Sequence, residues 1–164
     1  TPAQFRRDQR EYEAERKYAL KLDKQTIDRV APGQASSEQT HSFAGEKCET
    51  GDFGGRAYRE AYDGGWCSYR LKVASGEDQA LCVQYWGGDA GARTFDLLVD
   101  GRIIATQSLY RQKPNRFYRV LYPLDKPWLT NKSEITVRFQ AHAKNLAGGL
   151  YDLRIIRVGP ENGF

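Results

Sequence analysis

The sequence contains no methionine, only two histidines and three cysteines, and no long apolar run. His41 and His142 are far apart, and no G-x-S-x-G, H-E-x-x-H or Walker pattern occurs. These absences argue against the common hydrolase, metalloprotease and nucleotide-binding sites. Paired carboxylates for glycoside hydrolysis are compatible with the composition, but none lies in an apolar run that would raise its pKa. We therefore expect no enzyme activity from the chain itself.

The missing features also bear on the cellular context. A membrane span needs about 18 apolar residues in a row, and no such stretch exists, so we expect no membrane partner. No signal peptide is recognisable. Because the chain starts at Thr1-Pro2 without a methionine, we expect it to be part of a longer polypeptide.

The three cysteines, Cys48, Cys67 and Cys82, are too widely spaced for a C-x-x-C zinc site, and an odd number is not a disulfide framework. Cys67 shares strand parity with Tyr69, which we expect to point inward, whereas Cys82 alternates with inward-pointing Leu81. These two thiols should therefore lie on opposite faces, and we expect no bond between them. We interpret the cysteines as small filler residues.

The formal net charge of +4 is spread along the chain without a basic stripe. The densest cationic run, Arg111–Arg116, is typical of a solvated hairpin tip. The sequence therefore predicts no nucleic-acid partner. A hydrophobic content of 40% with 12% aromatic residues is sufficient for the core of one domain.

A helix is predicted from Thr1 to about Leu22, because Thr1, Pro2 and Gln4 supply a cap, a first-turn proline and a capping box. Its apolar stripe consists of Phe5, Tyr12 and Ala19, with Leu20 and Leu22. A stripe this narrow cannot build a core, so we expect the helix to pack against something else. Residues 31–39 have the composition of a linker. We assign residues 1–26 as a helix and connector from a missing upstream domain, and residues 27–164 as the β domain.

A short strand is predicted at Ile27–Val30, and from His41 onward every element is predicted as β. The predicted strands are Ala57–Tyr62, Trp66–Val73, Gln79–Trp86, Thr94–Val99, Arg102–Leu109, Arg116–Tyr122, Glu134–Gln140 and Leu150–Val158. Asp100-Gly101 predicts a two-residue hairpin turn with positive φ at both residues, and Lys126–Leu129 predicts a single helical turn. This spacing indicates an all-β sandwich or jelly roll.

Sugar recognition combines the flat faces of aromatic rings with polar side chains that bind hydroxyl groups. Trp66 and Trp86 lie beside Gly-rich segments, where a ring can face solvent while its strand stays packed. The candidate carbohydrate-binding residues are Trp66, Trp86, Asp63, Asp89, Arg93, Arg56 and Tyr58, with Arg59 and Glu60 in the same polar group. Two structural roles stay open as alternatives: the rings can belong to the core, and the polar group can form ion pairs on an outer strand face.

Calcium needs several oxygen ligands, mostly carboxylates and carbonyls. Glu46, Glu49 and Asp52 cluster in a segment that we interpret as a Gly-rich loop, and Asp152 lies in the last predicted strand. Glu46 and Asp152 are therefore candidate ligands of a structural Ca²⁺, without an EF-hand spacing. No other cofactor is predicted.

Several ordered motifs resemble a known module. They are H-S-F-x-G-E (His41–Glu46), G-D-F-G-G-R-x-Y-R-E-A (Gly51–Ala61), G-W-C-S-Y (Gly65–Tyr69), Y-W-G-G-D-A-G-x-R-x-F-D-L-L-V-D-G (Tyr85–Gly101) and F-Q-A-H-A-x-N-x-A-G-G-L-Y-x-L-R-I (Phe139–Ile155). The chain is similar, over about Ile27 to Val158, to the C-terminal domain of Bacteroides-type β-L-arabinofuranosidases, enzymes with an (α/α)6 catalytic barrel.

The resemblance implies a galactose-binding-like β-sandwich, accessory to a periplasmic or extracellular glycoside hydrolase. It implies two partners, the catalytic barrel of the parent chain and an arabinose-containing glycan. Such enzymes carry their catalytic glutamate, cysteines and zinc in the barrel, so the cysteines here should not inherit that role. Two functions stay open: a substrate-binding module, or a structural domain that docks on the barrel without binding sugar. A self-sufficient glycosidase is a third, disfavoured option.

Overall fold

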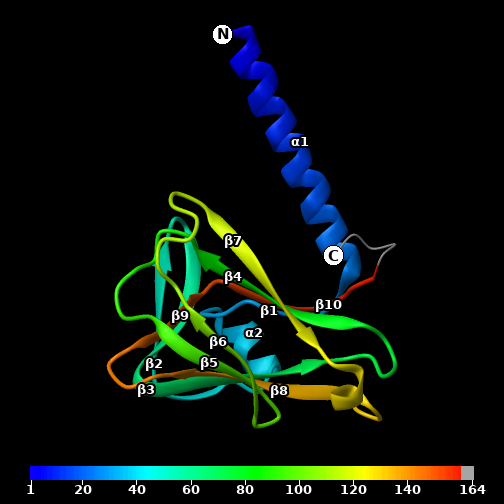
Figure 1. Cartoon of the computed structure of the whole chain (residues 1–164), viewed down its shortest axis with the longest axis vertical. Helices are drawn as coiled ribbons and strands as arrows, with labels where there is room; N and C mark the ends of the chain where they lie inside the picture. Colours follow the sequence, from blue (N-terminus) through cyan, green and yellow to red (C-terminus); the bar gives the residue numbers. More distant parts are fainter. Residues whose placement is uncertain (160–164) are drawn as a thin grey trace.

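The computed structural model describes residues 1–159, and its body is a sandwich of two antiparallel sheets from which one helix projects (Figure 1). The four-stranded sheet has the order β1 (Thr26–Val30), β10 (Asp152–Arg157), β4 (Gln79–Trp86) and β7 (Phe117–Leu124). The six-stranded sheet has the order β2 (Ala44–Phe53), β3 (Arg56–Lys72), β8 (Glu134–Ala141), β5 (Thr94–Val99) and β6 (Arg102–Ser108), and β9 (Leu146–Leu150) pairs with β3. The helices are α1 (Pro2–Gln25), α2 (Ala35–Thr40) and the 3-10 turn η1 (Lys126–Leu129). The predicted fold class, a β-sandwich preceded by an N-terminal helix, is confirmed.

The core lies between the sheets because alternate residues of each strand point inward. In β5, Phe95, Leu97 and Val99 are buried while their neighbours are partly exposed. Strand β4 is buried on both faces. Its outward-facing Cys82 packs with Leu22 of α1, in a small cluster separate from the main core that contains Cys67. Cys67 therefore faces the core between the sheets, whereas Cys82 faces outward toward α1, as the strand parity predicted.

Three local signals read from the sequence are also confirmed. Thr1 caps α1, since its hydroxyl oxygen accepts from the Gln4 backbone N–H at 3.1 Å. Asp100 and Gly101 have φ of 49° and 82° and join β5 to β6. The predicted turn η1 is present at Lys126–Leu129.

Other elements differ from the prediction. β2 occupies Ala44–Phe53, where a Gly-rich loop was expected, and β3 is one strand of 17 residues in place of two. The segment Asp63-Gly64-Gly65 does not end the strand, because Asp63 and Gly64 adopt positive φ within an irregularity of the pairing. The predicted strand Leu150–Val158 corresponds to β10, and β9, which was not predicted, precedes it with Tyr151 between them.

The segment expected to be a linker contains the helix α2, and a buried carboxylate anchors it. Glu38 of α2 is 5% exposed and accepts hydrogen bonds from Arg59 at 2.7 Å and from the Tyr69 hydroxyl at 2.6 Å. Burial opposes ionisation of Glu38, but the hydrogen bonds from Arg59 and Tyr69 outweigh it and lower its pKa. The ion pair fixes α2 against the inner face of β3.

Helix α1 packs on the sandwich near its C-terminal end, and its N-terminal part extends away from it (Figure 1). Leu22 is buried, whereas the stripe residues Phe5, Tyr12 and Leu20 are 68%, 64% and 61% exposed. No helix in residues 1–159 combines the length and the apolar content that a membrane crossing requires.

Candidate functional site

The tip of the β2–β3 hairpin lies against the ends of β4 and β7, and five aromatic rings meet there. We call them the aromatic cluster: Phe53, Tyr58, Trp86, Phe117 and Tyr151. The ring centroids of Trp86 lie 5.0 Å from Phe53 and 4.9 Å from Phe117. Those of Tyr151 lie 4.9 Å from Phe117 and 5.4 Å from Tyr58. The rings therefore form a continuous aromatic surface across both sheets.

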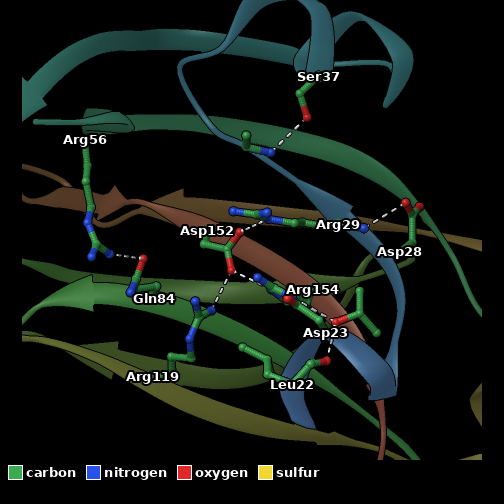
Figure 2. A network of polar contacts seen from close by, with 12 residues as sticks. Leu22, Asp23, Asp28, Arg29, Ser37, Arg56, Gln84, Arg119, Asp152 and Arg154 are labelled. Carbon is green, nitrogen blue, oxygen red and sulfur yellow. Dashed lines mark hydrogen bonds and ion pairs between the residues drawn. The ribbon is translucent and has the colours of Figure 1, made fainter. Parts of the chain in front are cut away.

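The hairpin tip reaches the cluster because Gly54 and Gly55 adopt φ of 58° and 73°, a conformation that favours glycine. Next to them, the Arg56 guanidinium lies 4.2 Å from the centroid of Phe117. Arg56 also donates to the Gln84 side-chain oxygen at 3.1 Å, as Figure 2 shows. These contacts hold β3 of one sheet against β4 and β7 of the other.

On one side of the cluster is a hollow of about 190 Å³, lined by Phe53, Tyr58, Glu60, Asp89, Arg93, Gly149 and Tyr151. Its polar side is organised by Arg93, which donates to Glu60 at 3.1 Å and to the Gly148 carbonyl oxygen at 2.7 Å. Arg93 also donates to the Ala90 carbonyl oxygen at 3.0 Å. The guanidinium is therefore held in one orientation between the β4–β5 loop and β9.

Asp89 supplies an unsatisfied acceptor to this hollow. Its Oδ2 atom is buried and has no hydrogen-bond partner among the described residues, and its other oxygen lies 3.9 Å from Arg93. Burial raises the pKa of Asp89 and also that of Glu60, although Arg93 opposes both shifts. A buried carboxylate oxygen without a donor costs free energy, which a ligand hydroxyl could recover.

On the other side of the cluster, a groove of about 960 Å³ runs between α1 and the outer face of the four-stranded sheet. Its lining residues are Ala14, Glu15, Tyr18, Arg56, Gln84, Trp86, Lys113, Asn115, Arg116, Phe117, Tyr118 and Arg119. Among them, four side chains are cationic and only Glu15 is anionic. The hollow and the groove thus lie against different rings of the aromatic cluster, and the groove has the size of a ligand site.

Behind the groove, a buried carboxylate accepts hydrogen bonds from three guanidinium groups (Figure 2). Asp152 is 1% exposed and accepts from Arg29 at 2.6 Å, Arg119 at 2.5 Å and Arg154 at 2.8 Å. Burial raises the pKa of Asp152, but the Arg119 and Arg154 guanidiniums outweigh burial and hold it below its usual value. Arg154 also donates to Asp23 of α1 at 2.7 Å. The network therefore joins α1, β1, β7 and β10.

The structure does not bring together the two candidate calcium ligands. Glu46 lies on β2 of the six-stranded sheet, opposite Trp66, and is exposed, whereas Asp152 lies on β10 of the other sheet. The Asp152 oxygens are occupied by guanidinium groups, which disfavours a cation beside them. In residues 1–159, no group of three or more His, Cys, Asp or Glu side chains is placed to hold a metal ion.

Of the predicted carbohydrate-binding residues, the structure places three at the hollow, Tyr58, Asp89 and Arg93, and two at the groove, Arg56 and Trp86. Trp66 and Asp63 lie elsewhere. Trp66 is on the outer face of the six-stranded sheet, where the Arg138 guanidinium lies 4.2 Å from its ring centroid. Asp63 is in the strand irregularity and accepts from the Lys144 backbone N–H at 2.8 Å.

Sequence reasoning missed three rings of the cluster, Phe53, Phe117 and Tyr151. They come from three distant segments, and Phe117 and Tyr151 have the pattern of ordinary strand residues. The only local signal was Phe53 directly before Gly54-Gly55, a turn beside an exposed aromatic residue. Glu60 was named in the polar group, but its pairing with Arg93 was not.

The sandwich is similar to solved carbohydrate-binding modules. A family 35 module from Clostridium thermocellum has a TM-score of 0.56 and 16% identity, over 79% of this chain and 98% of that one. The family 35 module of Paenibacillus barcinonensis has a TM-score of 0.55 and 9% identity, over 79% and 98%. The C-terminal family 6 module of the laminarinase LamC from Zobellia galactanivorans has a TM-score of 0.54 and 9% identity, with the same coverage.

At these identities the likeness shows the fold, a jelly-roll sandwich of the kind found in carbohydrate-binding modules. No curated protein matches the sequence. A family model matches residues 21–156, which include the whole sandwich from β1 to nearly the end of β10. The chain therefore belongs to the family of unknown function DUF6805.

Proposed function

We propose that this chain is a non-catalytic carbohydrate-binding module whose sugar site is the aromatic cluster with the adjoining hollow. The observation that carries the proposal is the unpartnered Oδ2 of Asp89 beside the rings of Tyr58 and Tyr151. Aromatic faces bind the apolar C–H patches of a sugar, and a fixed carboxylate accepts hydrogen bonds from its hydroxyl groups. The guanidinium of Arg93, which is held in one orientation, adds hydrogen-bond donors to the site.

The dimensions favour an oligosaccharide over a single sugar. The hollow of about 190 Å³ is smaller than most ligand pockets, whereas the groove beyond Trp86 and Phe117 is about 960 Å³. A chain end in the hollow would leave the next units free to follow the aromatic cluster into the groove. We further propose an arabinose-containing glycan, because the motifs resemble the C-terminal domain of β-L-arabinofuranosidases.

That resemblance also supports the wider setting of the proposal, in which the module accompanies the catalytic barrel of a periplasmic or extracellular glycoside hydrolase. The module would hold plant-polysaccharide side chains near the barrel. Binding by one such site is weak, since an affinity near 1 mM corresponds to only about 4 kcal/mol. The loss of one ring contact is therefore enough to remove detectable binding.

The test is calorimetric titration of the chain with arabino-oligosaccharides, for the unchanged protein and for Trp86→Ala and Asp89→Asn. Trp86→Ala removes a ring of the cluster, and Asp89→Asn keeps the size of the side chain while it removes a charged acceptor. Both should abolish or strongly weaken binding. Trp66→Ala is the matched control, because Trp66 lies on the outer face of the six-stranded sheet, away from the cluster. Equal weakening by Trp66→Ala, or full binding by Asp89→Asn, would contradict the site.

A different observation favours a second candidate function. Phe5, Tyr12 and Leu20 of α1 are exposed on a helix that leaves the sandwich. This favours a structural domain that docks on the catalytic barrel through α1. If so, Phe5→Ser with Tyr12→Ser should weaken cross-linking of the chain to that barrel while sugar titration stays unchanged.

A further inference from the structure

Two of the three cysteines lie next to each other, on neighbouring strands of the six-stranded sheet. In the β2–β3 pairing, Gly45 lies opposite Cys67, and Cys48 lies opposite Ala61. The register shifts between Glu46 and Cys48: only Lys47 lies between them on β2, opposite residues 62–65 of β3, so the extra residues are on β3. Cys48 on β2 and Cys67 on β3 therefore flank this bulge.

Cys48 also lies close to Gly45, the residue that pairs with Cys67. A Cβ atom added to Gly45 would lie 3.2 Å from the Cβ of Cys48. Cys48 packs against the main core, of which Cys67 is a member. Both residues carry free thiols in this structure. Cys82 is remote from them, since it belongs to the other cluster beneath α1.

We propose that Cys48 and Cys67 form an intramolecular disulfide when the protein meets a thiol oxidant, a small-molecule or protein disulfide. The bond would tie β2 to β3 at the base of the hairpin that carries Phe53, Arg56 and Tyr58 to the candidate site. No spacing motif indicates this pair, because the strand irregularities of β2 and β3 create the contact.

The surroundings give the two sulfurs different roles. Cys67 is 0% exposed, whereas Cys48 is half-buried and faces the oxidant first. The hydrogen bond with Cys67 lowers the pKa of Cys48, and the nearby Arg59 guanidinium adds to the effect despite burial. The same contact, together with burial, raises the pKa of Cys67. Cys48 is therefore the thiolate that reacts, and Cys67 is the thiol that completes the bond.

The reaction balances with one oxidant molecule. The Cys48 thiolate attacks a sulfur of the oxidant's disulfide, and the oxidant's other sulfur leaves as a thiolate. Cys67 then loses its proton to solvent and attacks the Cys48 sulfur of the mixed disulfide, which releases the second oxidant thiolate. Two thiols lose two protons and two electrons, and one disulfide of the oxidant becomes two thiols.

The experiment treats the folded protein with oxidised glutathione, removes the reagent, and counts thiols after denaturation under acid-quenched conditions. We expect a fall from three thiols to one, with intact mass lower by two hydrogens. Peptide mapping should place the bond between Cys48 and Cys67. Cys82→Ser is the matched control and should fall from two thiols to none. Cys67→Ser should stop at a glutathione adduct on Cys48.

Three free thiols after treatment, a bond that includes Cys82, or a glutathione adduct on Cys48 in the unchanged protein that never resolves would each overturn the proposal. The oxidised protein should also melt at a higher temperature than the reduced one, because the bond restricts the unfolded chain. Reductant should reverse this shift in the unchanged protein and in Cys82→Ser, and should have no effect on Cys48→Ser.

Discussion

Replacement of Asp152 by asparagine tests the view that one buried carboxylate holds four elements together. The substitution keeps the size of the side chain but removes the charge that faces Arg29, Arg119 and Arg154. The side chains of Arg119 and Arg154 are 16% and 7% exposed, so water cannot easily replace the lost partner. Removal of one member of a buried ion pair typically costs about 3–5 kcal/mol, and we expect a loss of stability in that range.

The measurement is urea unfolding at pH 7, followed by tryptophan fluorescence and by circular dichroism. Asp78→Asn is the control, because the Asp78 side chain is 63% exposed and its pairing with Lys126, at 3.6 Å, is on the surface. Such a pair contributes about 0–1 kcal/mol. A loss below about 1 kcal/mol for Asp152→Asn, equal to that of the control, would refute the reasoning.

The same carboxylate predicts a pH dependence with a definite sign. Because the pKa of Asp152 is lower in the folded state than in the unfolded state, its ionised form stabilises the fold. This contribution is complete above the unfolded pKa of about 3.9 and is lost as the pH falls through the folded value. As the pH falls below about 5, the unchanged protein should therefore lose more stability than Asp152→Asn does.

Three further predictions concern other parts of the molecule. Gly101→Val should destabilise the domain by about 1 kcal/mol or more in urea unfolding, because φ at this residue is 82° and a β-branched side chain resists that conformation; Gly101→Asn should cost less. Gly87→Ala should destabilise it more strongly, because a Cβ there would lie 1.9 Å from the Lys113 carbonyl oxygen, and a near-normal melting temperature would contradict the close approach of these backbones. The chain should not hydrolyse aryl arabinosides, and turnover that disappeared on replacement of Glu60 or Asp89 would overturn the non-catalytic interpretation.

The parts of the fold that could be predicted are those in which a local signal and the tertiary structure agree. Phe95, Leu97 and Val99 alternate because one face of β5 is buried, and Asp100-Gly101 allows the turn that follows. β2 gave no such signal, because it is largely exposed and its side chains do not alternate between core and solvent. Its strand conformation depends on the partner β3.

The candidate site was predictable only in part for a similar reason. Asp89 and Arg93 are close in sequence, and Trp86 directly precedes their loop, so one segment indicated three residues of the site. Phe117 and Tyr151 join them through the order of strands in the sheets, which no local pattern specifies. The buried Glu38 was missed because its partners, Arg59 and Tyr69, are on another element.

The length of helix α1 sets the direction in which Phe5 and Tyr12 point as well as their distance from the sandwich. At 1.5 Å per residue its 24 residues span about 36 Å, and its last turn is held to the sheet by Leu22 and by the ion pair of Asp23 with Arg154. Each residue advances the helix by about 100°, so the direction of Phe5 and Tyr12 relative to the hollow is set by the number of residues between them and Leu22. One inserted residue in that interval would turn Phe5 and Tyr12 about a quarter of a circle around the helix axis, whereas seven inserted residues would lengthen the helix and nearly restore their direction.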